Sequence, residues 1–297
     1  MSQSHVMSRR RERVREGETA SVGGRLGLLF LEIACIVLAV LLFGVPFWFV
    51  IVNALKTRAE AAEMTIALPK AAQLVENFSE VLQARNGMVI RAFVNSTVIT
   101  VASIAVLILV CAMAGFVMQR RRGRGTPFID FLVLAGLMIP PAVVPTVWVL
   151  NGIGLFKTLP GLILVEVALS FPFSALLYKG FMGSIPREID ESAVMDGCSG
   201  LVLFLRIIFP LLKPVTATII VLSSVGIFND FANPLYFLPG AKNVTVQLTL
   251  YNFTSMYISS WNLLFADVVL ISIPPLILFV FFNKRIVAGM TAGAVKA

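Results

Sequence analysis

The chain has 297 residues, of which 58% are hydrophobic and only 13% are charged, and its mean hydropathy is +0.91. This composition excludes a water-soluble domain, and the apolar residues come in runs of about 20, the length of a membrane-spanning helix. The net charge is +8, but no basic stripe carries interleaved aromatic residues, so we expect no nucleic-acid partner. The sequence predicts an all-α, polytopic protein in contact with membrane lipid. The short alternating segments of a β-barrel are missing.

Residues 1–25 are polar and rich in arginine, and we expect them to form a disordered, basic cytoplasmic tail. A cleaved signal peptide is the alternative. The apolar run that follows is too long for the core of a signal peptide and lacks a small-residue cleavage site. Residues 26–284 are expected to form one transmembrane domain, and residues 285–297 a second cytoplasmic tail.

The apolar runs predict six transmembrane helices. They cover approximately residues 27–52, 92–118, 128–150, 160–180, 214–232 and 264–283. Prolines interrupt the third, fourth and sixth: Pro140, Pro141, Pro145, Pro172, Pro274 and Pro275. Proline removes a backbone donor and kinks a membrane helix, and the freed carbonyl groups need packing or a wet cavity. Kinks in three spans predict helices that curve around a pathway.

The basic residues orient these spans. If the N-terminus lies in the cytoplasm, the cytoplasmic segments hold 17 of the 24 Lys and Arg residues and the outer segments hold 7. Because cytoplasmic loops of membrane proteins are enriched in Lys and Arg, both termini and residues 184–214 are predicted to be cytoplasmic.

Polar residues near the outer ends of the spans have two interpretations each. Glu166, in the fourth span, is either functional, as intramembrane charges often are, or hydrogen-bonded to a neighbouring helix. Asn229, Asp230 and Asn233 either line an outward cavity that binds hydroxyl groups or form a helix C-terminal turn.

Two outer segments are longer than the rest. Residues 53–91 carry mixed charge and have room for a short helix. Residues 233–262 mix polar and aromatic side chains. Such a mixture either contacts a partner or a sugar, or places aromatic rings at the membrane interface.

Enzyme motifs are missing from the sequence. No phosphate-binding P-loop and no zinc-binding HExxH motif occur, and His5 is the only histidine. Cys35, Cys111 and Cys198 have no metal-ligand spacing, so we interpret them as buried, inert thiols without a metal or disulfide. We therefore expect a non-catalytic chain that carries no cofactor.

Residues 184–214 form a polar, cytoplasmic segment within this apolar chain. Pro186 suits the first turn of a short helix and Gly197 the position after its end. Acidic residues in the first turn (Glu188, Asp190 and Glu191) suit the helix dipole. Small residues follow, among them Ser192 and Ala193, so the backbone can approach another surface closely. We expect this helix to lie in a groove on a partner.

This segment resembles the EAA motif of ABC-importer permeases. The matching residues are Glu191-Ser192-Ala193, Asp196-Gly197 and Ile207-Ile208-Phe209-Pro210. The sequence departs from the motif at Ser192, in place of alanine, and at Phe209, in place of leucine. Both changes are mild in size or polarity.

Other stretches resemble one branch of these permeases, the carbohydrate permeases similar to the maltose-type second membrane subunit. They are residues 55–57, 138–141, 184–188, 229–235 and 289–296, with Phe228 where that branch has tryptophan. The resemblance extends from about residue 27 to the end of the chain.

The resemblance implies a bacterial plasma (inner) membrane protein with the type I ABC importer permease fold. It implies a homologous second permease subunit, a dimer of ATP-binding subunits that hold ATP and Mg, and an extracytoplasmic solute-binding protein that delivers sugar. The helix at 188–197 would couple to the ATPase, and residues 289–296 would contact the ATPase dimer.

The EAA motif alone also fits a non-sugar cargo. A self-sufficient secondary transporter is disfavoured, because no inverted repeat or ion relay is present.

The resemblance assigns three groups of candidate residues. The ATPase-coupling residues are Glu188, Glu191, Ser192, Ala193, Asp196, Gly197, Arg206 and Pro210, although Arg206 also fits a residue that extends to the membrane interface. The translocation-pathway candidates are Asn229, Asp230 and Asn233. The candidates that face the binding protein are Tyr251, Asn252, Tyr257 and Trp261.

Overall fold

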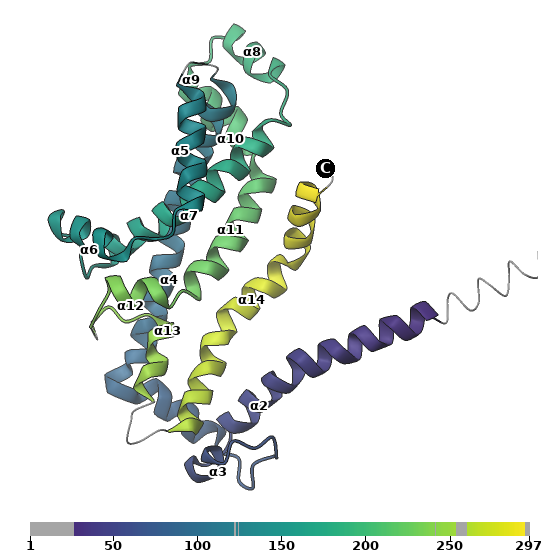
Figure 1. Cartoon of the computed structure of the whole chain (residues 1–297), viewed down its shortest axis with the longest axis vertical. Helices are drawn as coiled ribbons and strands as arrows, with labels where there is room; N and C mark the ends of the chain where they lie inside the picture. Colours follow the sequence, from purple (N-terminus) through teal and green to yellow (C-terminus); the bar gives the residue numbers. More distant parts are fainter. Residues whose placement is uncertain (1–26, 122, 124, 241, 254–259, 295–297) are drawn as a thin grey trace, which may run out of the picture.

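The computed structural model describes residues 27–121, 123, 125–240, 242–253 and 260–294, and these ranges contain helices and no strand. The helices run between two ends of an elongated molecule, marked by α3 (Arg58–Ala62) and α8 (Glu188–Met195) (Figure 1). We call them the α3 end and the α8 end. The all-α prediction is confirmed for the described residues. The predicted tail at residues 1–25 lies outside them.

Four helices are long and apolar enough to cross a membrane. They are Gly27–Ala54, Leu74–Arg120 (α4), Leu159–Met182 (α7) and Trp261–Phe281, the first part of α14 (Trp261–Ala294). The first contains a π-helical turn at Val40–Gly44 and ends as α2 (Val45–Ala54). These helices confirm the predicted first, second, fourth and sixth apolar helices. The predicted tail at residues 285–297 continues α14 as helix as far as Ala294.

The predicted third span, residues 128–150, is not one continuous helix. It consists of α5 (Thr126–Met138) and α6 (Val143–Gly152), which meet at an angle of 115°. The break contains Pro140 and Pro141, which supply no backbone N–H to continue the helix. The predicted proline kink is therefore present, and it is much larger than an ordinary one.

The predicted fifth span, residues 214–232, corresponds to α11 (Lys213–Phe228). A helix of three short pieces precedes it: α9 (Gly200–Val202), the π-helical η2 (Leu203–Ile208) and α10 (Phe209–Leu211). The two parts are bent by 72°. The described residues thus hold four long apolar helices and two bent pairs.

Shorter elements form the α3 end. The helix α3 begins with a reciprocal cap, in which the Glu60 backbone N–H donates to Thr57 Oγ1 and the Thr57 N–H donates to Glu60 Oε2. In α4 the helical conformation is interrupted at residues 84–87, where Arg85, Asn86 and Gly87 have positive φ angles. The helix expected within residues 53–91 is therefore present twice, as α3 and as the first part of α4. The remaining short helices are α12 (Ala232–Phe237), α13 (Val246–Thr249) and η3 (Leu250–Asn252).

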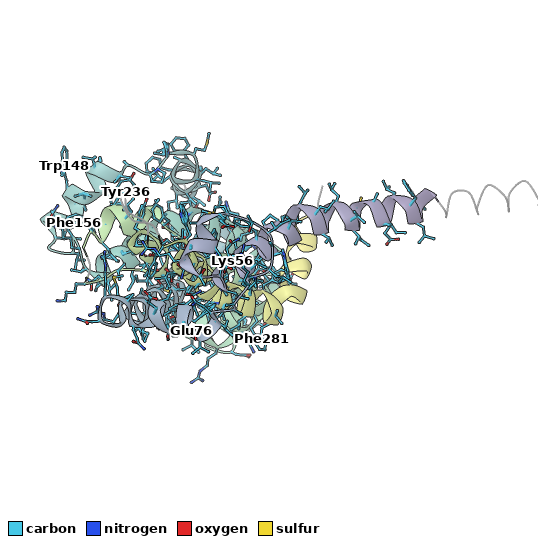
Figure 2. All side chains as sticks on the ribbon, turned by 90° about the horizontal axis from the view of Figure 1, so that it is seen from below. Lys56, Glu76, Trp148, Phe156, Tyr236 and Phe281 are labelled. Atoms are coloured by element: carbon cyan, nitrogen blue, oxygen red, sulfur yellow. The ribbon has the colours of Figure 1, made fainter. Side chains whose placement is uncertain are left out.

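The core is built around α4 and α7, and it depends on one glycine. A Cβ atom at Gly115 would lie 2.6 Å from Tyr178 Cβ and 2.9 Å from the Lys179 backbone nitrogen. Only glycine allows this approach. The Tyr178 hydroxyl also lies 2.9 Å from Thr216 Oγ1, which joins α7 to α11. The first helix, by contrast, projects from the bundle (Figures 1 and 2), and its apolar side chains up to Phe47 are exposed.

Candidate functional site

The helix α8 has the start and end that the sequence predicts. Glu188, Asp190 and Glu191 occupy its first turn. At its other end, Gly197 has a φ of +80°. The N–H of Gly197 donates to the Val194 carbonyl and the N–H of Cys198 to the Ala193 carbonyl, both at 3.0 Å. This pair of bonds requires a left-handed residue after the helix, which glycine adopts without strain. A Cβ atom at Gly197 would have no neighbouring atom of this chain within 4 Å.

One face of α8 packs on its own chain. Ala193 is 4% exposed and belongs to an apolar cluster with Phe204 and Ile208, against which Ile189 and Cys198 also pack. The prediction that Ala193 permits close approach to a partner therefore needs correction. Its small side chain faces inward and lets α8 lie close to η2.

The opposite face of α8 is exposed. It carries the predicted coupling residues Glu188, Glu191, Ser192, Asp196 and Gly197. Sequence reasoning missed Val194 and Met195, which are 59% and 86% exposed on this face. The sequence does contain a signal for this exposed apolar contact surface, because two adjacent large apolar residues end a short helix that is otherwise polar.

Two arginines fix α8 to the rest of the chain. Arg120, the last residue of α4, forms an ion pair with Asp190, with 2.6 Å between Nε and Oδ2. Its Nη2 also donates to the Ile185 carbonyl at 3.1 Å. Arg187 Nη2 donates to the Gln119 carbonyl at 3.2 Å. The sequence analysis used Arg120 only in the count of basic residues that orients the spans. Its ion-pair partner was not predicted, because Asp190 lies 70 residues further along the chain.

The remaining coupling candidates lie in the helix that follows α8. Arg206 is exposed in η2, and Pro210 is exposed in α10. Phe209, one of the departures from the motif, is half-buried, and its ring centroid lies 5.9 Å from that of Phe204. The larger side chain is therefore accommodated within the apolar cluster that holds α8.

The three pathway candidates lie together with Glu166. Asp230 Oδ1 accepts from the backbone N–H groups of Ala232 and Asn233, at 2.9 and 3.3 Å, so Asp230 caps α12. Asn233 Nδ2 donates to Glu166 Oε1 at 3.3 Å. Asn229 Oδ1 accepts from Gln247 at 3.2 Å. The structure therefore contains the helix C-terminal turn that was one alternative for Asn229, Asp230 and Asn233. It also contains the hydrogen bond to a neighbouring helix that was one alternative for Glu166.

The candidates for the binding-protein surface are only partly described. Tyr251 is exposed, and its ring centroid lies 5.5 Å from that of Phe231. Trp261 is half-buried beside Phe265. The backbone of Asn252 forms part of η3, and Tyr257 lies outside the described residues.

Sequence reasoning missed an exposed aromatic group. Trp148 and Tyr236 are exposed and Phe156 is half-buried. Figure 2 shows these three side chains at the edge of the molecule opposite the projecting first helix.

A buried polar cluster at the α3 end was also missed. Lys56 is 2% exposed, and its Nζ donates to Asn53 Oδ1, the Thr65 carbonyl and Thr65 Oγ1, at 3.1, 2.6 and 2.9 Å. Asn77 Nδ2 donates to the carbonyls of Ala54 and Lys56, both at 2.9 Å, and Asn77 Oδ1 accepts from Asn262 at 2.8 Å. Lys56 is labelled in Figure 2, which views the molecule from the α3 end. The cluster joins the ends of α2, α4 and α14.

Within the described part of the chain, no group of three His, Cys, Asp or Glu side chains has metal-binding geometry. Cys111 is buried and Cys198 half-buried, but Cys35 is exposed on the projecting helix. The prediction of a buried Cys35 is therefore wrong for the isolated chain. None of the other described residues packs on that part of the first helix.

Known proteins are similar to this chain in sequence and in fold. Residues 107–292 match the family described as "Binding-protein-dependent transport system inner membrane component". A probable starch degradation products transport system permease protein, AmyC, from Thermoanaerobacterium thermosulfurigenes is 32% identical, over 86% of this chain and 93% of the relative. The melibiose/raffinose/stachyose import permease protein MelC of Bacillus subtilis (strain 168) is 31% identical, over 85% and 91%.

A solved structure supports the fold assignment. The crystal structure of a bacterial ABC transporter involved in the import of the acidic polysaccharide alginate contains a chain with a TM-score of 0.73 at 18% identity. The alignment covers 86% of our chain and 96% of that chain. Since the family match covers well over half of the sequence and includes α8, the chain belongs to the binding-protein-dependent transport system inner membrane components.

Proposed function

We propose that this chain is one of two permease subunits of an ATP-driven sugar importer in a bacterial inner membrane. It forms half of the translocation pathway, and α8 couples that pathway to a dimer of ATP-binding subunits. ATP and Mg bind to those subunits, and this chain catalyses no reaction. An extracytoplasmic solute-binding protein delivers the sugar.

The exposed face of α8 is the observation that carries this proposal. It presents acidic side chains beside Val194 and Met195, while its opposite face and two arginines hold it on the membrane helices. A helix fixed in this way transmits force from a partner to the bundle, because ion pairs and packing connect it directly to α4 and η2.

The orientation follows from charge. Arg120, Arg121, Lys179, Arg187, Arg206 and Lys213 lie at the α8 end or in segments next to it. Cytoplasmic segments are enriched in such residues, which supports the proposal that this end lies in the cytoplasm. In the proposed topology each bent pair counts as one crossing, so that the chain crosses the membrane six times and both termini lie in the cytoplasm.

A sugar cargo is supported by the relatives, whose names refer to starch degradation products and to melibiose, raffinose and stachyose. Asn229, Asp230 and Asn233 lie near the outer end of α11 and offer amide and carboxyl groups to sugar hydroxyls. The aromatic residues Trp148, Phe156 and Tyr236 provide flat apolar surfaces. Melting of the cognate binding protein with sugars, amines and peptides tests this choice, and stabilisation by a non-sugar alone would exclude it.

The coupling role is tested by reversing charge on the exposed face of α8. We expect Glu191→Lys to abolish sugar uptake and to reduce co-purification of the ATP-binding subunit. Glu76→Lys is a matched control, because Glu76 is exposed near the α3 end and undergoes the same change of charge (Figure 2). Met195→Glu should act like Glu191→Lys, since it places a charge where an apolar contact is expected.

Two results would contradict the proposal. Normal uptake by both α8 variants would remove α8 from the coupling role. Transport by this chain alone in liposomes without ATP would instead identify a self-sufficient transporter. Gly197 is a poor first target, because any side chain there strains the left-handed turn of the chain itself.

A further inference from the structure

A basic pocket lies at the α8 end, beside the coupling helix. Its volume is about 650 Å³. The end of α4, the start of α5, the end of α7 and the segment before α8 all contribute to its wall: Gln119, Arg121, Thr126, Pro127, Lys179 and Arg187. Neither the family assignment nor the proposed coupling accounts for this pocket.

The charge of the pocket favours an anion. Three of its lining residues are basic (Arg121, Lys179 and Arg187) and one is acidic, Asp130. Asp130 Oδ1 lies 2.8 Å from Lys179 Nζ, so one positive charge is neutralised locally. Arg187 donates to the Gln119 carbonyl and keeps its remaining N–H groups for another acceptor. The net charge of +2 and the several N–H donors suit a phosphate group, which accepts several charge-assisted hydrogen bonds.

An apolar surface begins directly beside this pocket. Phe128, Phe131 and Leu132 are 63%, 63% and 52% exposed on α5. Their spacing places them on one face of that helix, and Phe131 follows the pocket residue Pro127 by one helical turn (i, i+4), so this face meets the pocket at Pro127. A phosphate in the pocket would thus have the edge of this exposed apolar face one helical turn away, on the Pro127 side of the pocket. This pairing of a charged head site with an apolar flank matches a phospholipid better than a soluble phosphate.

We propose that this pocket binds the phosphate headgroup of an anionic phospholipid, whose acyl chains lie along the exposed face of α5. The inference rests on the proposed placement of the α8 end at the cytoplasmic leaflet, and it does not depend on the cargo. Since Arg187 contacts both the pocket and the carbonyl of Gln119, the lipid lies next to a residue that holds α8. The lipid would therefore add to the contacts that hold the coupling helix.

Native mass spectrometry of the purified transporter complex tests this site. The probes are phosphatidylglycerol and phosphatidylcholine, which share the phosphodiester but differ in net charge. We expect preferential retention of phosphatidylglycerol. Arg121→Gln should reduce that preference about fivefold, because each basic residue near a membrane surface contributes about 1 kcal/mol to anionic-lipid binding. Asp130→Asn should change it in the opposite direction by a similar factor, since Asp130 is the only acidic residue among the described residues that line the pocket.

The matched control is Lys213→Gln, an exposed basic residue at the start of α11 that does not line the pocket. It should leave lipid retention unchanged. Equal retention of both lipids, or unchanged retention in Arg121→Gln, would overturn the proposal. Displacement of the lipid by millimolar glycerol phosphate would identify a soluble-phosphate site instead. Failure of the coupling proposal would appear separately, as normal uptake by Glu191→Lys with lipid retention intact.

Discussion

At the α8 end, ion pairs that water partly reaches hold α8 and the nearby helix ends. The Arg120–Asp190 side chains are 11% and 16% exposed, and those of Lys179–Asp130 are 26% and 27% exposed. At the α3 end, a fully buried lysine and three asparagines join the ends of α2, α4 and α14 through hydrogen bonds to neutral oxygens. Ion pairs that water can reach are weakened by solvent and salt, whereas breaking a buried polar network leaves unsatisfied groups. The α3 end is thus built as a rigid base, and the α8 end as an adjustable joint.

The largest expected effect comes from the buried lysine. Lys56→Met removes three hydrogen bonds and leaves the buried Asn53 Oδ1 without its lysine donor. We expect the free energy of unfolding to fall by about 3 kcal/mol, observed as a lower melting temperature of the purified subunit. Lys70→Met is the control, because Lys70 is exposed in the same connecting segment. Equal melting temperatures for the two variants would show that the α3 end is not the rigid base.

Asn77 tests whether the network acts as a unit. Asn77→Ala deletes two donated bonds and one accepted bond, and we expect a loss of about 2 kcal/mol. A double-mutant cycle with Asn262→Ala should give a coupling energy of about 1 kcal/mol, because the two side chains share a hydrogen bond. Strict additivity in thermal melts would argue against a connected network.

The Arg120–Asp190 pair should matter less for stability and more for coupling. Asp190→Asn is expected to cost about 1 kcal/mol and to lower sugar-stimulated ATP hydrolysis, because α8 loses its main ion pair with α4. Raising the salt concentration should weaken the wild-type joint and have little effect on the variant. The exchange Arg120→Asp with Asp190→Arg should restore hydrolysis. If the exchange fails while both single variants remain folded, the pair does not hold α8.

The smallest effect is expected at the most exposed pair. Lys179→Gln should change the free energy of unfolding by no more than about 0.5 kcal/mol. Thermal melts at low and high salt measure it. A loss comparable to that of Lys56→Met would contradict the contrast between the two ends.

The sequence predicts best where the signals are local. The boundaries of α8 follow from Pro186 and Gly197, and the long apolar helices follow from their composition. The 115° break between α5 and α6 illustrates a limit, because Pro140 and Pro141 predict a kink but do not determine its angle. The bent helix before α11 is a second case, since residues 200–211 are apolar enough to join a span and were assigned to the polar segment.

The hydrogen-bond and ion-pair partners of the site residues are mostly distant in sequence, so these pairings could not be predicted from the sequence. Asn77 pairs with Asn262, 185 residues away, and Arg120 pairs with Asp190. Neither pairing follows from hydrophobic periodicity. The inward orientation of Ala193 was indicated in part, because it shares a helix face with Ile189. Which face is turned inward depends on packing against Phe204 and Ile208, which only the fold reveals.

The continuous part of α4 also has a mechanical consequence. Residues 88–120 form an uninterrupted helix, about 50 Å long at 1.5 Å per residue. Near one end, Asn95 and Ser96 bind the backbone of Val244 and Val246, and at the other end Arg120 holds α8. The helix therefore connects α13 and the segment before it to α8 as one continuous rod. A tilt of about 5° about one end moves the other by about 4 Å for a rod of that length, so under the proposed coupling a small rotation of α8 would displace the residues that contact Val244 and Val246.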